Sequence, residues 1–192
     1  MIAYVAVGLI DAEAKLTNAQ STYNTVIHHQ NSIIDKEKAL VSNLSTSNVT
    51  TGTSATTIQQ DKATVDQIIG QAKNAQPQIA GDNRSLTSAD TQLRNEGWLT
   101  VFSRSRLDRQ SKKDGYLLAA LADSKKISDD YVQVGPFLDA FLDVTIDVEN
   151  IGTKATAKDI SGMSAANEKL KADIAKAIQT DKAPGMPPEM DT

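Results

Sequence analysis

The 192-residue chain contains no cysteine and few aromatic side chains. Without cysteine it has no disulfide framework, no thiolate nucleophile and no cysteine-ligated zinc or iron–sulfur site. Aromatic residues make up 4% of the sequence, and much of its 40% hydrophobic content is alanine. Small side chains suit close contacts between helices and fill a wide globular interior poorly. We therefore expect a thin core.

The chain also lacks a strong excess of charge of either sign. Its formal net charge is -4 at pH 7, whereas nucleic-acid binding favours a strongly basic surface. We therefore expect no nucleic-acid partner.

Motifs of catalysis and metal binding are missing as well. The sequence contains no G-x-S-x-G elbow, no Walker loop, no H-E-x-x-H and none of the Glu-x-x-His pairs of di-iron bundles. Its two histidines, His28 and His29, are adjacent, and adjacent side chains point about 100° apart on a helix. We expect no enzyme activity, no cofactor and no metal site.

Long hydrophobic runs are absent except at the start. Residues 2–10 are unbroken apolar sequence with no lysine or arginine before them. A bilayer span needs about 20 residues, and a secretory signal carries a basic segment before its apolar region. We expect residues 1–10 to be the remnant of a membrane helix that continues into the next segment. The alternative is the buried start of a core helix.

A heptad pattern dominates residues 9–44. Apolar side chains recur there at steps of three and four residues, and only Gln30 and Glu37 interrupt the series. This spacing places one apolar stripe along a long helix, which must pack against other helices. A second row at Ile27, Ile34 and Val41 widens the stripe, as a bundle helix requires.

The rest of the chain supplies partner helices. Apolar spacing predicts helices over residues 54–80, 85–133, 136–150 and 155–181, with turns at 45–53, at 81–85, at Gly135-Pro136 and near Gly152. We predict an all-α fold, an elongated up-down-up-down four-helix bundle whose last helix is interrupted near Gly152. The bundle domain spans residues 11–182, and the proline-rich residues 183–192 form a tail or linker.

A basic segment follows the single tryptophan. After Trp98-Leu-Thr-Val-Phe102 come the cations Arg104, Arg106, Arg109, Lys112 and Lys113. We take Arg104, Arg106, Arg109 and Lys113 as candidates for binding an anionic ligand or lipid headgroups. The alternative buries Trp98 and Phe102 in the core and leaves the cations in solvent.

Three aspartates form an acidic ridge, because Asp139, Asp143 and Asp147 follow one another at four-residue steps. Like charges at this spacing repel by a few tenths of a kcal/mol per pair. A bound cation, or a basic partner such as Lys125 and Lys126, would offset the repulsion. The alternative is a solvated helix face.

Three N-x-S/T triplets, at Asn43, Asn48 and Asn83, fall at expected turns and are possible glycosylation sites. Together with the apolar start, they predict a non-enzymatic, extracytoplasmic domain that is tethered to the cell membrane. It would act as a spacer, surface component or protein-interaction module, with protein partners or self-association. One alternative is a ligand-sensing bundle for a small anionic ligand or a cation, and a second is a cytoplasmic helical scaffold.

Overall fold

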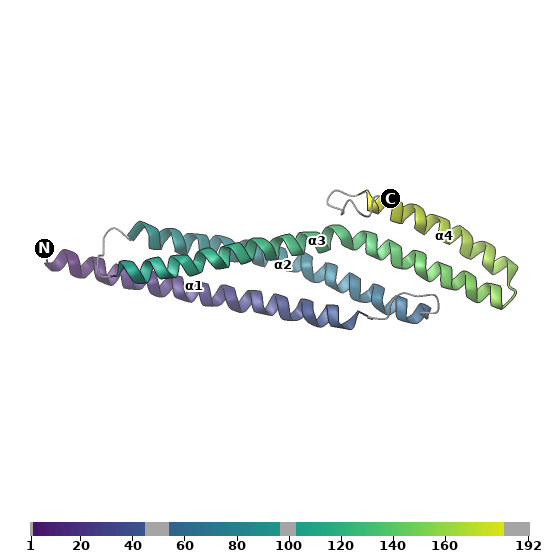
Figure 1. Ribbon diagram of the computed structural model, residues 1–192, viewed down its shortest axis with the longest axis horizontal. Helices are drawn as coiled ribbons and strands as arrows, with labels where there is room; N and C mark the ends of the chain where they lie inside the picture. The colour runs from purple at the N-terminus through teal and green to yellow at the C-terminus, as the bar shows by residue number, and fades with distance from the viewer. Residues whose placement is uncertain (1, 45–53, 97–102, 183–192) are drawn as a thin grey trace. The chain divides into compact units, whose positions relative to one another are not determined.

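The computed structural model describes residues 2–44, 54–96 and 103–182, and within them the chain forms four helices and no strand (Figure 1). The helices are α1 (Ile2–Asn43), α2 (Ala55–Glu96), α3 (Arg104–Thr156) and α4 (Ile160–Asp181). The prediction of an all-α fold with four helices is confirmed. Trp98, Phe102, Asn48 and residues 183–192, on which several expectations rest, lie outside the described residues.

The predicted turn at residues 81–85 is wrong, because α2 runs through it to Glu96. Ile79 and Leu86, on either side of Gly81, are 2% and 0% exposed. Burial of one such side chain stabilises by about 1.5–3 kcal/mol, more than the roughly 1 kcal/mol that a glycine costs inside a helix. The apolar spacing therefore outweighs the turn-forming residues, and Pro77 is accommodated inside the same helix.

The predicted break at Gly135-Pro136 is also absent, since α3 includes both residues. Gly135 allows a close approach between helices, because a Cβ atom at this position would lie 2.4 Å from Cδ1 of Ile69 on α2. The glycine is therefore a packing residue, and the segment predicted as a separate helix, 136–150, is the C-terminal part of α3.

The interruption expected near Gly152 lies further along the chain, between Thr156 and Ile160. Lys158 adopts a left-handed conformation there, with a φ of 56°. Asp159 then caps α4, and its Oδ1 accepts a hydrogen bond of 2.8 Å from the Gly162 backbone N–H. An aspartate side chain that accepts a hydrogen bond from a free backbone N–H stabilises the start of a new helix. The helix boundary therefore lies at Asp159 and not at Gly152.

The chain divides into two compact units. The first comprises residues 1–35 and 74–127, and the second comprises residues 36–73 and 128–192. The domain limits expected at residues 10 and 183 stay predictions.

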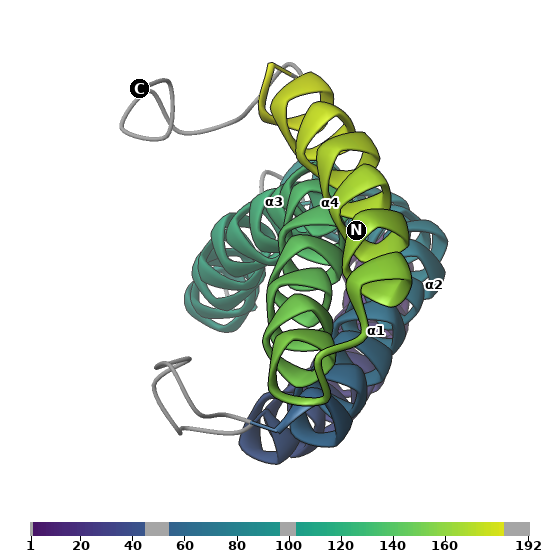
Figure 2. The same cartoon turned by 90° about the vertical axis from the view of Figure 1, so that its right-hand side faces the viewer.

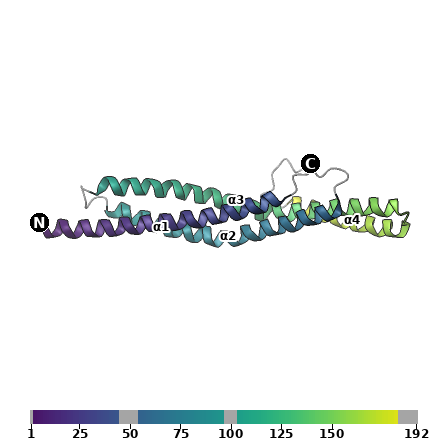
Figure 3. The same ribbon diagram turned by 90° about the horizontal axis from the view of Figure 1, so that it is seen from below.

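The first unit is built from three helical segments. The N-terminal part of α1, the C-terminal part of α2 and the N-terminal part of α3 lie side by side (Figure 1 and Figure 3). Two clusters of buried side chains form its core: one of Val26, Ile33, Ala75, Ile79, Leu86 and Leu121, the other of Leu16, Ala19, Ala89, Leu93 and Leu107. Early residues of α1 pack with late residues of α2, so these two segments are antiparallel.

The stripe predicted on α1 faces this core. Leu16, Ala19, Val26 and Ile33 are all buried. Gln30, which interrupts the stripe, is buried as well, and its amide donates a 3.0 Å hydrogen bond to Asp82 of α2. A buried polar side chain is costly unless it is paired. The interruption in the pattern is therefore a polar contact within the core.

The second unit contains the remaining parts of α1, α2 and α3, together with α4. Ile58, Val65, Leu142 and Ile146 form its buried cluster. The helix α4 lies along the C-terminal part of α3 (Figure 1 and Figure 2), yet none of its residues is buried. Its attachment therefore depends on contacts other than a deep apolar core.

Replacing Gly81 tests the continuity of α2. No atom lies within 4 Å of a Cβ built on this residue, so Gly81→Ala should raise the free energy of unfolding by about 0.5–1 kcal/mol, measured by urea denaturation. The matched control is Gly135→Ala, which should lower it by about 1–3 kcal/mol because the new methyl group would overlap Ile69. Destabilisation by Gly81→Ala would contradict a helical Gly81.

Candidate functional site

The cations predicted from the sequence lie in the first three turns of α3. The helix begins after Ser103, whose carbonyl accepts 3.0 Å hydrogen bonds from the N–H groups of Arg106 and Leu107. Leu107 is 2% exposed and faces the core. Since neighbouring residues point in different directions on a helix, the cations are divided between two faces.

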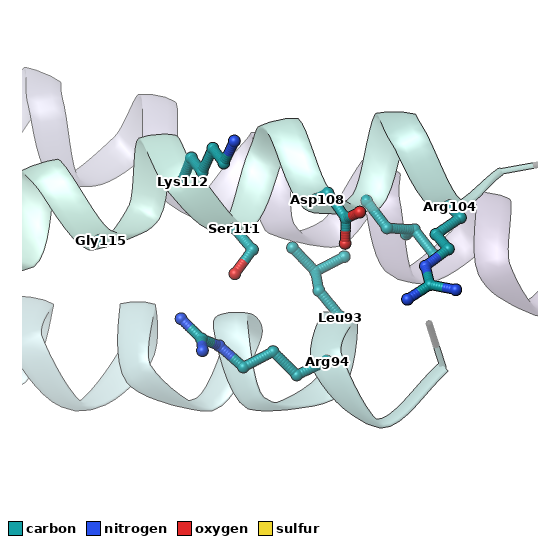
Figure 4. A pocket seen from close by; sticks show the side chains of 8 residues that line it. Leu93, Arg94, Arg104, Asp108, Ser111, Lys112 and Gly115 are labelled. Atoms are coloured by element: carbon teal, nitrogen blue, oxygen red, sulfur yellow. The ribbon is translucent and has the colours of Figure 1, made fainter. Parts of the chain in front are cut away.

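One face forms a groove with α2 in the first unit. The groove has a volume of about 640 Å³ and is lined by Leu93 and Arg94 of α2 and by Arg104, Leu107, Asp108, Ser111, Lys112 and Gly115 of α3. Figure 4 shows the side chains of Arg94 and Arg104 between the two helices, whereas that of Lys112 points away from α2. Two guanidinium groups from different helices therefore share one open space.

Arg94 is held in place by Asp90, one turn earlier on α2. Its Nε donates a 2.7 Å hydrogen bond to Oδ2 of Asp90, and the Ser111 hydroxyl donates to Oδ1 of the same carboxylate. Asp90 is 8% exposed, and the hydrogen bonds from Arg94 and Ser111 compensate its charge within the protein. Because only Nε is used in this bond, the terminal amino groups of Arg94 are not needed to hold its orientation.

The other face of the segment carries the remaining predicted residues. Arg106 forms a two-pronged ion pair with Glu13 of α1, with distances of 2.9 and 3.1 Å. Arg109 and Lys113 are exposed and do not line the groove. Of the four candidates, the structure places only Arg104 in the groove.

Arg94 was missed by the sequence analysis. With a turn at residues 81–85, Arg94 and Arg104 would belong to the same helix and could not line a groove between two helices. The unbroken apolar spacing from Ile79 to Leu93 was the signal that could have placed it on the preceding helix.

The acidic ridge lies on α3 in the second unit and faces lysines from two other helices. Lys62 of α2 contacts Asp139 and, at 3.1 Å, Asp143. Lys176 of α4 lies 3.6 and 3.5 Å from the same two carboxylates. The ridge thus has basic partners, which offset the repulsion between its carboxylates.

The partners suggested from the sequence are incorrect. Lys125 and Lys126 belong to α3 itself, so they are not on the neighbouring helix that the suggestion required. The aspartates are not a fully solvated face either, because the side chains of Asp139 and Asp143 are each 21% exposed.

The third member, Asp147, is almost completely buried, with 1% of its surface exposed. Lys169 of α4 donates hydrogen bonds of 2.6 Å to Asp147 and 2.9 Å to Asp173. Burial raises the pKa of Asp147, and the bond from Lys169 opposes this rise. The two hydrogen bonds in turn raise the pKa of Lys169, so Lys169 stays charged and links α4 to α3.

Loss of Lys169 should loosen α4. Lys169→Met leaves the buried carboxylate of Asp147 without its cation, and we expect the free energy of unfolding to fall by about 1–3 kcal/mol. Hydrogen exchange of residues 160–181 should become faster by at least about tenfold. Lys171→Met is the control, because Lys171 pairs with the exposed Glu168 at 2.7 Å, and a surface pair contributes about 0–1 kcal/mol. Equal effects of both variants would contradict the role of Asp147.

A further buried carboxyl, Asp114, lies on α3 in the first unit. It is 0% exposed, and its Oδ1 accepts a 2.8 Å hydrogen bond from Gln110. No hydrogen-bond partner is present for its Oδ2 among the described residues. Burial raises the pKa of Asp114 to about 6, the bond from Gln110 opposes this rise, and the nearby carboxylate of Asp90 adds to it.

Asp114 should make stability depend on pH. The pKa of its carboxyl group is higher in the folded protein than the ordinary 3.8, so the folded state binds the carboxyl proton more tightly than the unfolded state does. The free energy of unfolding therefore decreases as the pH rises from about 4 to about 6. Asp114→Asn should raise the free energy of unfolding by about 1–3 kcal/mol at pH 8 and leave it nearly unchanged at pH 3.5. Urea denaturation at the two pH values measures this, with the exposed Asp123→Asn as control. An equal effect at both pH values would contradict the assignment.

The possible glycosylation residues do not all lie at turns. Asn43 is the last residue of α1, whereas Asn83 is an exposed residue inside α2. The expected turn at Asn83 was wrong for the reason given for Gly81.

Within residues 2–44, 54–96 and 103–182, no helix combines the length and apolar character that crossing a membrane requires. In the same part of the chain, no group of three or more His, Cys, Asp or Glu side chains could hold a metal ion.

Comparison of the chain with protein families, with curated proteins and with solved structures finds no match in any of the three.

Proposed function

We propose that the protein is a non-enzymatic binding module whose α2–α3 groove takes a small ligand bearing carboxylate groups. The observation that carries this proposal is that Arg94 and Arg104, from different helices, line one groove of about 640 Å³. Ligand sites commonly have volumes of about 300–1,000 Å³, so the groove is large enough for a metabolite-sized molecule.

The chemistry of the lining supports a carboxylate. A guanidinium group presents parallel N–H donors that match the two oxygens of a carboxylate, and such charge-assisted bonds are about twice as strong as neutral ones. Leu93 and Leu107 also line the groove, with 1% and 2% of their surface exposed. Two cations on opposite helices suit a ligand with two carboxylates separated by a short aliphatic chain.

The groove also carries one carboxylate, that of Asp108. It could receive an ammonium group, so a dicarboxylic amino acid would use all three charged side chains. The groove is open to solvent, and the side chain of Arg94 is 66% exposed. Binding should therefore weaken as the ionic strength rises.

Glutamate and succinate are suitable probes, and isothermal titration calorimetry at low salt is the measurement. Arg94→Gln and Arg104→Gln should each weaken binding about tenfold or more, because each removes one charge-assisted contact of about 1.5–3 kcal/mol. Arg109→Gln is the matched control, since this exposed arginine lies outside the groove, and it should change affinity less than twofold. If wild-type protein binds neither probe, or if Arg109→Gln weakens binding as much, the proposal fails.

We also propose a cellular position for the protein, on the basis of its sequence. The apolar residues 2–10 and the surface rich in Ser, Thr, Asn and Gln support a domain tethered on the outer side of the cell membrane. A cytoplasmic scaffold is the alternative. Protease treatment of intact cells distinguishes them, because only an exterior domain is cleaved.

A role as spacer or protein-interaction module is the second candidate, and exposed apolar side chains in the second unit favour it. Phe141 and Val148 of α3 are 47% and 53% exposed, and Ile178 of α4 is 54% exposed. Exposed apolar patches often mark sites of protein contact or self-association. Sedimentation velocity over a range of concentrations tests self-association.

A further inference from the structure

A second cavity lies in the other unit and has the opposite character. It has a volume of about 370 Å³ and is enclosed by the end of α1, by α2 and by α3. Seven of its ten lining residues are aliphatic, and Asp130 is the single charged residue among them. The cavity is therefore a mainly apolar space with one acidic position.

Buried side chains form part of the lining of the cavity. Val65 and Ile68 of α2 are 8% and 6% exposed, whereas Val41 of α1 and Leu138 of α3 are 45% and 39% exposed. The lining thus includes both buried and partly exposed apolar side chains. A molecule that entered would cover apolar surface that now faces water.

Contacts join α2 and α3, two of the three helices that line the cavity, on both sides of it. Towards one end, the Ser128 hydroxyl of α3 donates a 2.8 Å hydrogen bond to the backbone carbonyl of Ala72 on α2. Towards the other end, Lys62 of α2 lies 3.1 Å from Asp143 of α3. Between these contacts, Ile69 lies against the backbone at Gly135. These contacts fix α2 and α3 relative to each other on either side of the cavity.

An apolar cavity of this kind favours an apolar occupant. Water there would find few hydrogen-bond partners, and the lining side chains of an empty cavity lose dispersion contacts. The volume lies within the common range for small-molecule sites. The lining thus favours an aliphatic or aromatic ligand over a polar one.

The acidic position selects among apolar ligands. Asp130 is exposed on α3 next to Tyr131, and both line the cavity. A carboxylate headgroup would be repelled by Asp130, whereas an ammonium group would be attracted to it. We propose that this cavity binds an amphiphilic amine, with its apolar chain between α1, α2 and α3 and its ammonium group at Asp130.

Decylamine, decanol and decanoate are matched probes for the proposal, used below the concentrations at which they form micelles. Titration followed by methyl NMR should shift the signals of Val65 and Ile68, and the affinity should decrease in the order amine, alcohol, carboxylate. Absence of binding by decylamine, or shifts confined to other methyl groups, would overturn the proposal.

Two variants distinguish the contribution of the apolar cavity to ligand binding from that of the charge on Asp130. Val134 of α3 lines the cavity, so the larger side chain in Val134→Trp should fill it and weaken decylamine binding more than tenfold, with helicity by circular dichroism confirming the fold. Asp130→Lys should reverse the preference between amine and carboxylate, with a change of about two- to fivefold for each ligand. Asp123→Lys is the control for net charge, because this exposed aspartate lies on α3 outside the cavity. Unchanged binding in Val134→Trp, or equal effects of the two lysine variants, would overturn the proposal.

Discussion

Burial of a narrow apolar seam between long helices is the interaction on which the structure depends. The side chains available for it are small, with 4% aromatic residues in the whole chain, so the core between the helices is narrow. A seam of this width holds helices side by side and leaves their outer surfaces in solvent. Grooves between neighbouring helices are then the places where a ligand can be enclosed.

Polar side chains within the seam give the packing its specificity. Asp82 accepts a hydrogen bond from Gln30 across two helices, and Asp147 accepts one from Lys169. Each of these carboxylates would be costly to bury without its partner. A shift of one helix along another would break these hydrogen-bonded pairs. Apolar contacts alone resist such a shift less strongly, because one leucine or isoleucine can replace another in the seam.

The two cavities follow from the same architecture and differ in the residues that line them. The groove of the first unit contains Arg94 and Arg104, so its chemistry suits anions. The cavity of the second unit has aliphatic walls and a single acidic residue, so it suits an apolar cation. Within one chain, neighbouring helices thus form two cavities whose linings differ in charge, and these are the sites that we propose for two different ligands.

Periodicity in the sequence determined the helical fold class and the inward face of α1, because a heptad stripe of leucine, isoleucine, valine and alanine can be buried only against other helices. It could not determine where the helices end. Gly81 and Gly135 have the same sequence signature as turn residues, and only the burial of Ile79 and Leu86, or the contact with Ile69, shows that the helix continues. The tertiary structure alone decided that Arg94 and Arg104 line the same groove and that Lys169 reaches Asp147, since the residues of each pair lie on different helices and their placement depends on the register of packing.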